Sequence, residues 1–244
     1  QADVIALANI LTGWSLDPRA LSGFGFFPNR HEPGPQILRG RRYNDDLRGG
    51  IQAVRDLAHD PHTAHHIATK FATYFIADQP SPQSVARLES VFNKTGGNLK
   101  ALAMAAVEDP AAWVPAPAKM RSPVEYVTAG YRLLGLPRGG NAAQQIRAAM
   151  GSARNMGEFP MTASSPNGWP LVSEAWTGPD AVLTRIEWAK QVGARMPPDF
   201  NVASVADAGM GPLLAPATRT AMARAESQGD ALALLLASPE FQRR

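Results

Sequence analysis

The stretch that decides the fold class is HDPHTAHHIATKFATYF, residues 59–75. Asp60 is a good helix N-cap, and Pro61 stands at the first helical position, where proline is favoured. Apolar residues then recur at the spacing of one helical face: Ile67, Phe71, Tyr74 and Phe75. The stretch therefore predicts an amphipathic helix that begins at Asp60 and ends before DQPSP, residues 78–82.

Helical periodicity continues on both sides of this stretch. Serine or aspartate followed by proline marks several helix starts, and glycine or proline marks helix ends. Further helices are predicted at 3–12, 47–58, from 82 to the TGGN stop at 95–98, at 99–107, 124–135, 142–154, 179–195, 216–227 and 230–237. A proline-rich joint is predicted at 110–123. We therefore expect a mainly α fold, a compact multi-helix array that forms a single domain over residues 1–244.

Two segments interrupt the helices. Residues 14–46 form a long irregular segment that is dense in glycine and proline. Within it, the aromatic run at 24–27 and the apolar pair Ile37 and Leu38 predict one short two-stranded β-ribbon near residues 20–45. Residues 156–179 are also too rich in proline and glycine for regular structure. A loop of that length is unusual unless it has a function, so this segment is a functional candidate.

Composition excludes several classes of protein. The hydrophobic content of 45% is ample for a core, and the charged content of 18% lies below the globular average of about 25%. A formal charge of +3 is too small to indicate nucleic-acid binding, which needs a concentrated basic face. The chain has no cysteine, so disulfides, thiolate chemistry and iron–sulfur clusters are excluded. No apolar run approaches the roughly 18 residues of a membrane span.

Four of the five histidines fall between His59 and His66. His62, His65 and His66 share a face of the predicted helix, and this spacing suits two imidazoles on one zinc ion. The first turns of a helix disfavour a cation, however, and favour an anion. We interpret these histidines mainly as capping, packing and solvated groups and predict no cofactor. An anion contact by His62 and His66, and a metal site of His62, His65 and His66, remain as alternatives.

The motif RHEPG offers a second candidate site. His31 beside Glu32 supplies an imidazole and a carboxylate, the groups of an acid–base pair, and Arg30 precedes them. Adjacent residues on an extended chain point opposite ways, so such a pair would need partners from elsewhere. The alternative interpretation is that His31 hydrogen-bonds a backbone carbonyl and pins an irregular loop.

The motif SPNGWP, residues 165–170, offers a third candidate site. Asn167 and Gly168 predict a tight turn. Trp169 beside them is either an exposed aromatic platform for sugar or peptide, or an anchor that pins the long loop to the core. We favour the anchor.

Seven motifs occur in a specific order: QADVIALANILTGW, RHEPGPQILRGRRY, HDPHTAHHIATKFATYFIADQPSPQSVARLESVF, KMRSPVEYVTAGYRLLG, SPNGWP, TRIEWA and LLLASPEFQRR. Together they resemble the bacterial domain-of-unknown-function family 1800, over essentially residues 1–244. Lys70 and Asp78 fit the pattern of that family. The family tends to have His-Pro where this chain has Asp60-Pro61, and His62 and His65 stand where members often carry other residues. The resemblance thus counts against a shared metal site.

The resemblance has further implications. It places the chain as the C-terminal half of a typical member, so that an upstream helical half is an expected partner. A start without Met, already in helical periodicity, likewise leads us to expect a processed product or a fragment. The resemblance also implies export from a bacterial cell, hence a periplasmic or secreted location. It suggests a sulfatase-like protein of domain-of-unknown-function family 1501 as partner, and it implies no known reaction.

Two functions therefore compete, and the sequence does not decide whether the protein is an enzyme. The first is a non-catalytic exported binding or scaffold protein that acts with a partner protein or a cell-surface polymer. The alternative is a hydrolase, metal-dependent in one version, whose site joins the RHEPG loop to the cluster His59–His66. The residues that we expect to bind are Arg30, His31, Glu32, His62, His66, Lys70, Asn167 and Trp169.

Overall fold

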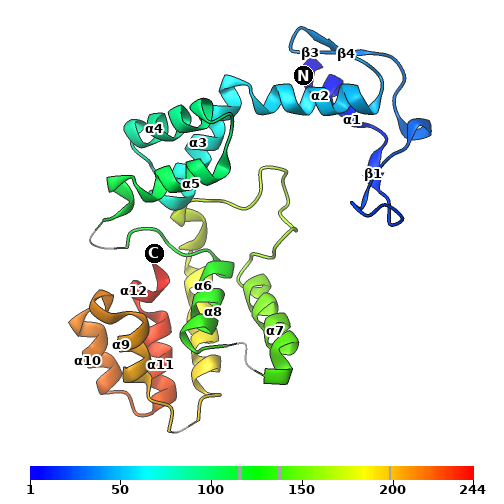
Figure 1. The fold of residues 1–244 in the computed structure, drawn as a ribbon. Coiled ribbons are helices and arrows are strands. Elements are labelled where there is room, and N and C mark those ends of the chain that lie inside the picture. Colours follow the sequence, from blue (N-terminus) through cyan, green and yellow to red (C-terminus); the bar gives the residue numbers. More distant parts are fainter. Residues whose placement is uncertain (115–116, 137–138, 198) are drawn as a thin grey trace. The chain divides into compact units, whose positions relative to one another are not determined.

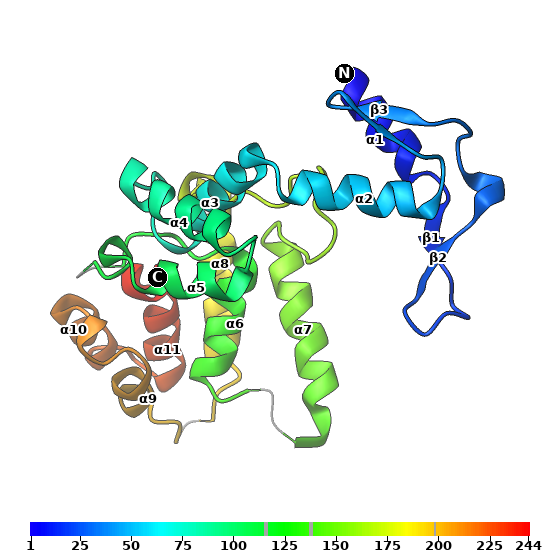
Figure 2. The ribbon, with the colours of Figure 1, turned by 45° about the horizontal axis from the view of Figure 1, so that its top comes forward.

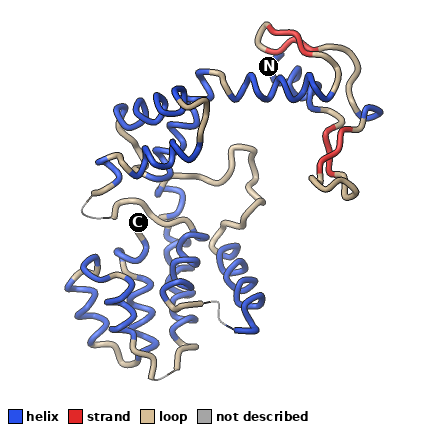
Figure 3. The backbone as a smooth tube through the Cα atoms, in the orientation of Figure 1, coloured by secondary structure: helices blue, strands red, loops and turns tan. Residues whose placement is uncertain are grey.

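The computed structural model describes residues 1–114, 117–136, 139–197 and 199–244, and it is mainly helical, as predicted (Figure 3). Residues 115–116 of the predicted proline-rich joint lie outside this part. The described helices are α1 (Ala2–Leu11), α2 (Leu47–Ala58), α3 (Pro61–Phe75), α4 (Pro82–Lys94), α5 (Leu99–Val107), α6 (Pro123–Leu133), α7 (Ala142–Asn155), α8 (Pro179–Gly193), α9 (Val202–Gly209), α10 (Pro216–Ala223), α11 (Gln228–Ala237) and α12 (Pro239–Gln242).

Most predicted helices lie within two residues of their expected bounds, but three details differ. Helix α10 ends at Ala223 instead of residue 227, because the Ser227 side chain accepts the Asp230 N–H at 3.1 Å and so caps α11. Ser227 cannot be both the end of α10 and the N-cap of α11, so α10 ends earlier. Helices α9 and α12 were not predicted, since both are short. Each nevertheless has a side-chain cap, from Asn201 and Ser238 respectively.

The irregular segment contains two β-ribbons. Strand β1 (Trp14–Leu16) pairs antiparallel with β2 (Phe24–Phe26), and β3 (Gln36–Leu38) pairs antiparallel with β4 (Arg41–Tyr43). The ribbon was expected, but its predicted pairing between residues 24–27 and 37–38 is wrong. Each strand pairs instead with its nearest neighbour in sequence, which costs less loop-closure entropy.

The turn between β3 and β4 explains why that local pairing is available. It consists of Arg39 and Gly40, which have φ angles of 49° and 78°. Two positive φ values suit the right-handed twist of a tight hairpin, but they are unusual for arginine. The Asp3 side chain accepts the Arg39 N–H at 2.7 Å and so holds this conformation in place.

The described residues divide into two compact units. Unit 1 comprises residues 1–69 and 82–107, and unit 2 comprises residues 70–81 and 108–244, so the division falls within α3. In unit 1, α1 packs on β3 and α2 around a small core (Figure 2). That core contains Ala6, Ile10, Leu38, Tyr43 and Ala53. The expectation of a single domain over residues 1–244 stays a prediction.

Unit 2 is built around the helix pair α8 and α11, which run side by side (Figures 1 and 2). Their backbones approach closely where Gly193 meets Gly229, since a Cβ atom on Gly193 would lie 2.2 Å from the Gly229 carbonyl oxygen. Helix α6 adds the fully buried Tyr126, whose ring lies edge-on to Trp188 and Phe241. This core fixes the ends of α6 and α12, which carry the site described below.

Candidate functional site

Three histidines of the predicted cluster, His59, His62 and His65, each contact a different neighbour. The Nδ1 atom of His59 lies 2.7 Å from the Arg55 carbonyl oxygen, and that of His65 lies 2.8 Å from the Glu89 carboxylate. His62 contacts Asp60 twice, through its backbone N–H at 2.8 Å and through Nδ1 at 2.9 Å. These bonds cap α3 as predicted and lower the pKa of the Asp60 carboxyl.

His66, the remaining member of the cluster, is exposed. Within the part of the chain that the structure describes, no three His, Cys, Asp or Glu side chains are grouped to hold a metal ion.

The RHEPG loop is attached to the end of α1. The Nδ1 atom of His31 lies 2.9 Å from the Thr12 carbonyl oxygen, and the Glu32 N–H donates to the Thr12 hydroxyl at 2.7 Å. The Arg30 guanidinium lies 4.8 Å from the centre of the Phe27 ring. These contacts favour the interpretation in which His31 pins an irregular loop, because its ring is engaged by backbone.

Two predicted binding residues do meet in unit 2. The Lys70 ammonium donates to the Asn167 carbonyl oxygen at 3.0 Å. Trp169 donates its indole N–H to the Phe159 carbonyl oxygen at 3.1 Å, and its ring centre lies 6.4 Å from that of the buried Trp176. Trp169 therefore has the contacts of an anchor for segment 156–179.

A buried ion pair fixes the same segment. Lys119, whose side chain is only 4% exposed, pairs with Asp78 and donates to the Leu171 carbonyl oxygen at 3.0 Å. The Asp78 carboxylate also accepts the Ser173 N–H at 3.1 Å. Burial raises the pKa of Asp78, but the hydrogen bonds from Lys119 and Ser173 outweigh it, so the net pKa is lowered. Lys119 was not among the predicted residues.

Unit 2 contains a pocket of about 710 Å³. Ligand-binding clefts in proteins commonly measure roughly 300–1,000 Å³, so this one is large enough for a small organic molecule. Its walls come from the C-terminal end of α3, from α6 and from the chain around α9 and α12. The lining residues are Tyr74, Arg121, Val124, Glu125, Thr128, Ala129, Arg132, Leu133, Gly209, Met210, Phe241 and Arg244.

The one carboxylate in this lining is already satisfied by three donors. Glu125 accepts the Tyr74 hydroxyl at 2.6 Å, the Ser122 N–H at 2.9 Å and the Arg244 guanidinium at 3.1 Å. The Ser122 bond is half of a capping box that begins α6, because the Glu125 N–H returns to the Ser122 hydroxyl. Burial and the hydrogen bond to Glu125 raise the pKa of Tyr74 to about 12.

Three arginines, Arg121, Arg132 and Arg244, also line this pocket. The Arg244 guanidinium lies 4.6 Å from the centre of the Tyr74 ring, and that of Arg121 lies 5.2 Å from the centre of the Phe241 ring. Both are therefore held against aromatic rings. Arg132 is exposed and makes no ion pair with any described residue. Three guanidinium groups against one carboxylate give this lining a net positive charge.

A fourth arginine supports the pocket from the core. Arg185 has no exposed surface, and its guanidinium donates to the Arg121 carbonyl oxygen at 2.8 Å. It also lies 5.0 Å from the centre of the Tyr126 ring. Arg185 therefore fixes the backbone of Arg121 at the start of α6.

The chemistry available in this pocket is binding of an anion. Arginine stays protonated, and its planar N–H groups match carboxylate geometry. With a pKa of about 12, Tyr74 keeps its proton near neutral pH, and Glu125 is occupied by three donors. Tyr74 is therefore not suited to proton transfer at that pH, since catalytic groups work best with a pKa near the operating pH.

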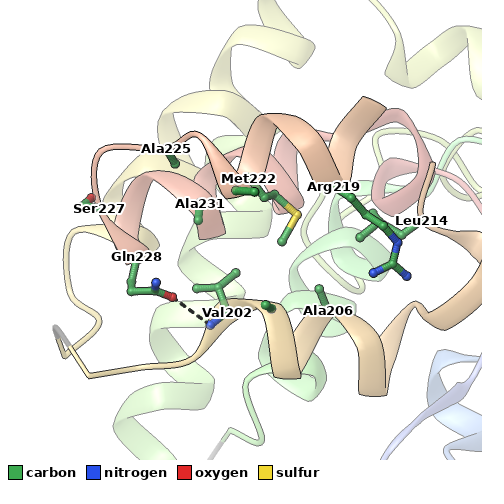
Figure 4. Close-up of a pocket in the computed structure, with 11 residues that line it drawn as sticks. Val202, Ala206, Leu214, Arg219, Met222, Ala225, Ser227, Gln228 and Ala231 are labelled. Atoms are coloured by element: carbon green, nitrogen blue, oxygen red, sulfur yellow. Dashed lines mark hydrogen bonds between the residues drawn. The ribbon is translucent and has the colours of Figure 1, made fainter. Parts of the chain in front are cut away.

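A second cavity, between α9, α10 and α11, has a volume of only about 200 Å³ (Figure 4). Its walls include the core side chains of Val202, Met222 and Ala231. Arg219 at its edge is already bound to Asp207 and to the Gly211 carbonyl oxygen. We interpret this cavity as a packing gap.

Sequence reasoning missed the arginine-lined pocket. Tyr74 was assigned only to an apolar helix face, and Arg244 stands more than a hundred positions after Arg121 and Arg132 in the chain. The available signal was indirect, because Arg121 and Glu125 lie in KMRSPVEYVTAGYRLLG and Arg244 ends LLLASPEFQRR, two of the motifs that carry the family resemblance.

The fold and the pocket define a mainly helical protein with an arginine-lined pocket. The family model described as "Protein of unknown function (DUF1800)" matches residues 1–243, so the chain belongs to this family. Comparisons with curated proteins and with solved structures found no match. Among the helices of the described ranges, none has the length and apolar character needed to cross a membrane.

Proposed function

We propose that the chain is a non-catalytic binding or scaffold protein that holds a partner protein or a cell-surface polymer through the arginine-lined pocket of unit 2. The supporting observation is the lining itself. Three guanidinium groups and a partly apolar wall line the pocket, and its one carboxylate, Glu125, is already bonded to Arg244, Tyr74 and the Ser122 N–H. Such a site attracts an anionic group and orients it.

Binding fits this pocket better than hydrolysis does. A hydrolase needs a base or a nucleophile that is free near neutral pH. In the pocket, Glu125 and Tyr74 are bonded to each other, and the raised pKa of Tyr74 keeps it protonated. The hydrolase alternative draws on His31 and the cluster His59–His66, where His31, His59, His62 and His65 are engaged by neighbours.

The place of action and the partner complete the proposal. Export, with a periplasmic or secreted location, is supported by membership of the family, because the resemblance to that family implies it. By the same reasoning, the proposed partners are the upstream half of the protein and a sulfatase-like protein of domain-of-unknown-function family 1501. A cell-surface polymer with acidic groups is the second class of partner that the positive lining would accept.

The test is a pull-down from the periplasm or culture fluid of the source bacterium with three purified proteins: the unmodified chain, Arg132→Gln and Arg147→Gln. Arg147 is an exposed arginine on α7 outside the pocket, so it controls for the loss of one positive charge. We expect a stoichiometric protein or polymer with the unmodified chain and with Arg147→Gln, and much less with Arg132→Gln. Recovery of none, or equal recovery by all three, contradicts the proposal.

A further inference from the structure

We infer that the arginine-lined pocket of unit 2 takes an organic carboxylate with an apolar body, in which one anionic head lies against the arginines and the apolar part lies along α6 and Phe241. This inference rests on the proposed binding function and names the chemical class of its ligand. It concerns the pocket alone and needs no particular partner.

The head group is determined by the arginines. Arg132 has no ion pair in the described chain, so its guanidinium can receive an anion without breaking an existing one. The Arg121 and Arg244 groups are held against the Phe241 and Tyr74 rings, which restricts their orientation. Arginine binds a carboxylate through two parallel N–H···O bonds, a geometry that a neutral amide cannot reproduce.

The apolar part of the ligand is indicated by the wall of the pocket that carries no arginine. That wall is apolar and includes Val124, Ala129, Leu133, Met210 and Phe241. Contact with it removes apolar ligand surface from water, which stabilises the complex. A small inorganic anion would leave this wall unused. A carboxylate with an apolar chain uses both walls, and the volume of about 710 Å³ accommodates it.

Titration calorimetry on the full chain tests this inference with three probes: octanoate, octanamide and acetate. Octanamide keeps the apolar chain and removes the charge, whereas acetate keeps the charge and removes the chain. We expect octanoate to bind at one site per chain and the other two to bind at least about ten-fold more weakly, which corresponds to one lost interaction of ordinary strength. Octanamide or acetate binding as tightly as octanoate overturns the inference, as does the absence of octanoate binding.

Two variants assign the binding to the pocket. Arg132→Gln should weaken octanoate binding about ten-fold, and Arg147→Gln should leave it unchanged. Circular dichroism verifies that both variants are folded. If Arg132→Gln does not fold, protection of Arg132 from phenylglyoxal by octanoate in the unmodified chain replaces it, and a lack of protection overturns the inference.

The pull-down keeps the two proposals separate. An Arg132-dependent partner without octanoate binding would overturn the ligand class and leave the binding function intact. Octanoate binding with no recovered partner would support the ligand class and contradict the proposed partner or polymer.

Discussion

Burial of Tyr74 and its hydrogen bond to Glu125 contribute to the loss of stability of unit 2 at alkaline pH. A tyrosine whose pKa is raised by folding contributes its full stabilisation below its ordinary pKa of 10.0 and loses it as pH rises toward about 12. Tyr74→Phe should therefore make the stability fall less steeply between those pH values. Urea unfolding at several alkaline pH values measures this. Equal slopes for the unmodified chain and the variant would show that Tyr74 titrates normally.

A second prediction concerns the pair of Lys119 and Asp78. Asp78→Asn leaves a buried ammonium without its carboxylate, so we expect a loss of about 3 kcal/mol, at the low end for a buried pair because Asp78 is partly exposed. The double variant Asp78→Asn with Lys119→Met should recover most of it. Asp207→Asn breaks the exposed pair with Arg219 and is the control, with an expected loss of about 0.5 kcal/mol. Equal losses for the two asparagine variants in urea unfolding would contradict this.

Single residues also show where sequence reasoning was drawn to the wrong feature. The histidines of 59–66 attract notice because they are rare and adjacent, yet His59 ends α2, and His62 and His65 in α3 contact Asp60 and Glu89. The arginines of the pocket are separated by up to 123 positions, from Arg121 to Arg244. Arg121 and Arg132 stand in one motif, but only tertiary packing brings Arg244 and Tyr74 to the same pocket, so no local pattern could indicate it.

At the scale of elements, the approach of α8 to α11 gives a clear prediction. Gly193→Ala would place a Cβ atom 2.2 Å from the Gly229 carbonyl oxygen, so the helices must separate. We expect a loss of about 3 kcal/mol, as for other overpacked contacts. Gly151→Ala, inside α7 with no atom within 4 Å of its Cβ, should gain about 0.5–1 kcal/mol from reduced backbone entropy. Urea unfolding compares them, and changes of the same sign would contradict the close packing.

Helices were easier to predict than ribbons, and the reason is local. A cap and a proline at the first position define the start of α3 and of α6 within a few residues. The pairing of a strand depends on which segment lies opposite it. In residues 14–46 the pairing follows from two turns, one between β1 and β2 and one between β3 and β4. The positive φ of Arg39, held by Asp3, illustrates the difficulty, since arginine at that position gives no signal of a turn.

At the scale of the whole molecule, periodicity and composition sufficed for the fold class and for membership of the family. They could not indicate the pocket, because it forms where the end of α3, the start of α6 and the residues after α12 meet within unit 2. They favoured the anchor role for Trp169 but could not indicate that its indole N–H donates to the Phe159 carbonyl oxygen. A pocket that is built from three segments far apart in the chain can be recognised only once the tertiary structure is known.

The most direct test of the anion-binding pocket is a crystal structure of the full chain grown with octanoate. We predict one octanoate molecule in the pocket of unit 2, with its carboxylate within hydrogen-bonding distance of the Arg132 guanidinium and its alkyl chain against Phe241. An octanoate molecule bound elsewhere, or none in this pocket at a concentration that saturates the protein in solution, would contradict the account.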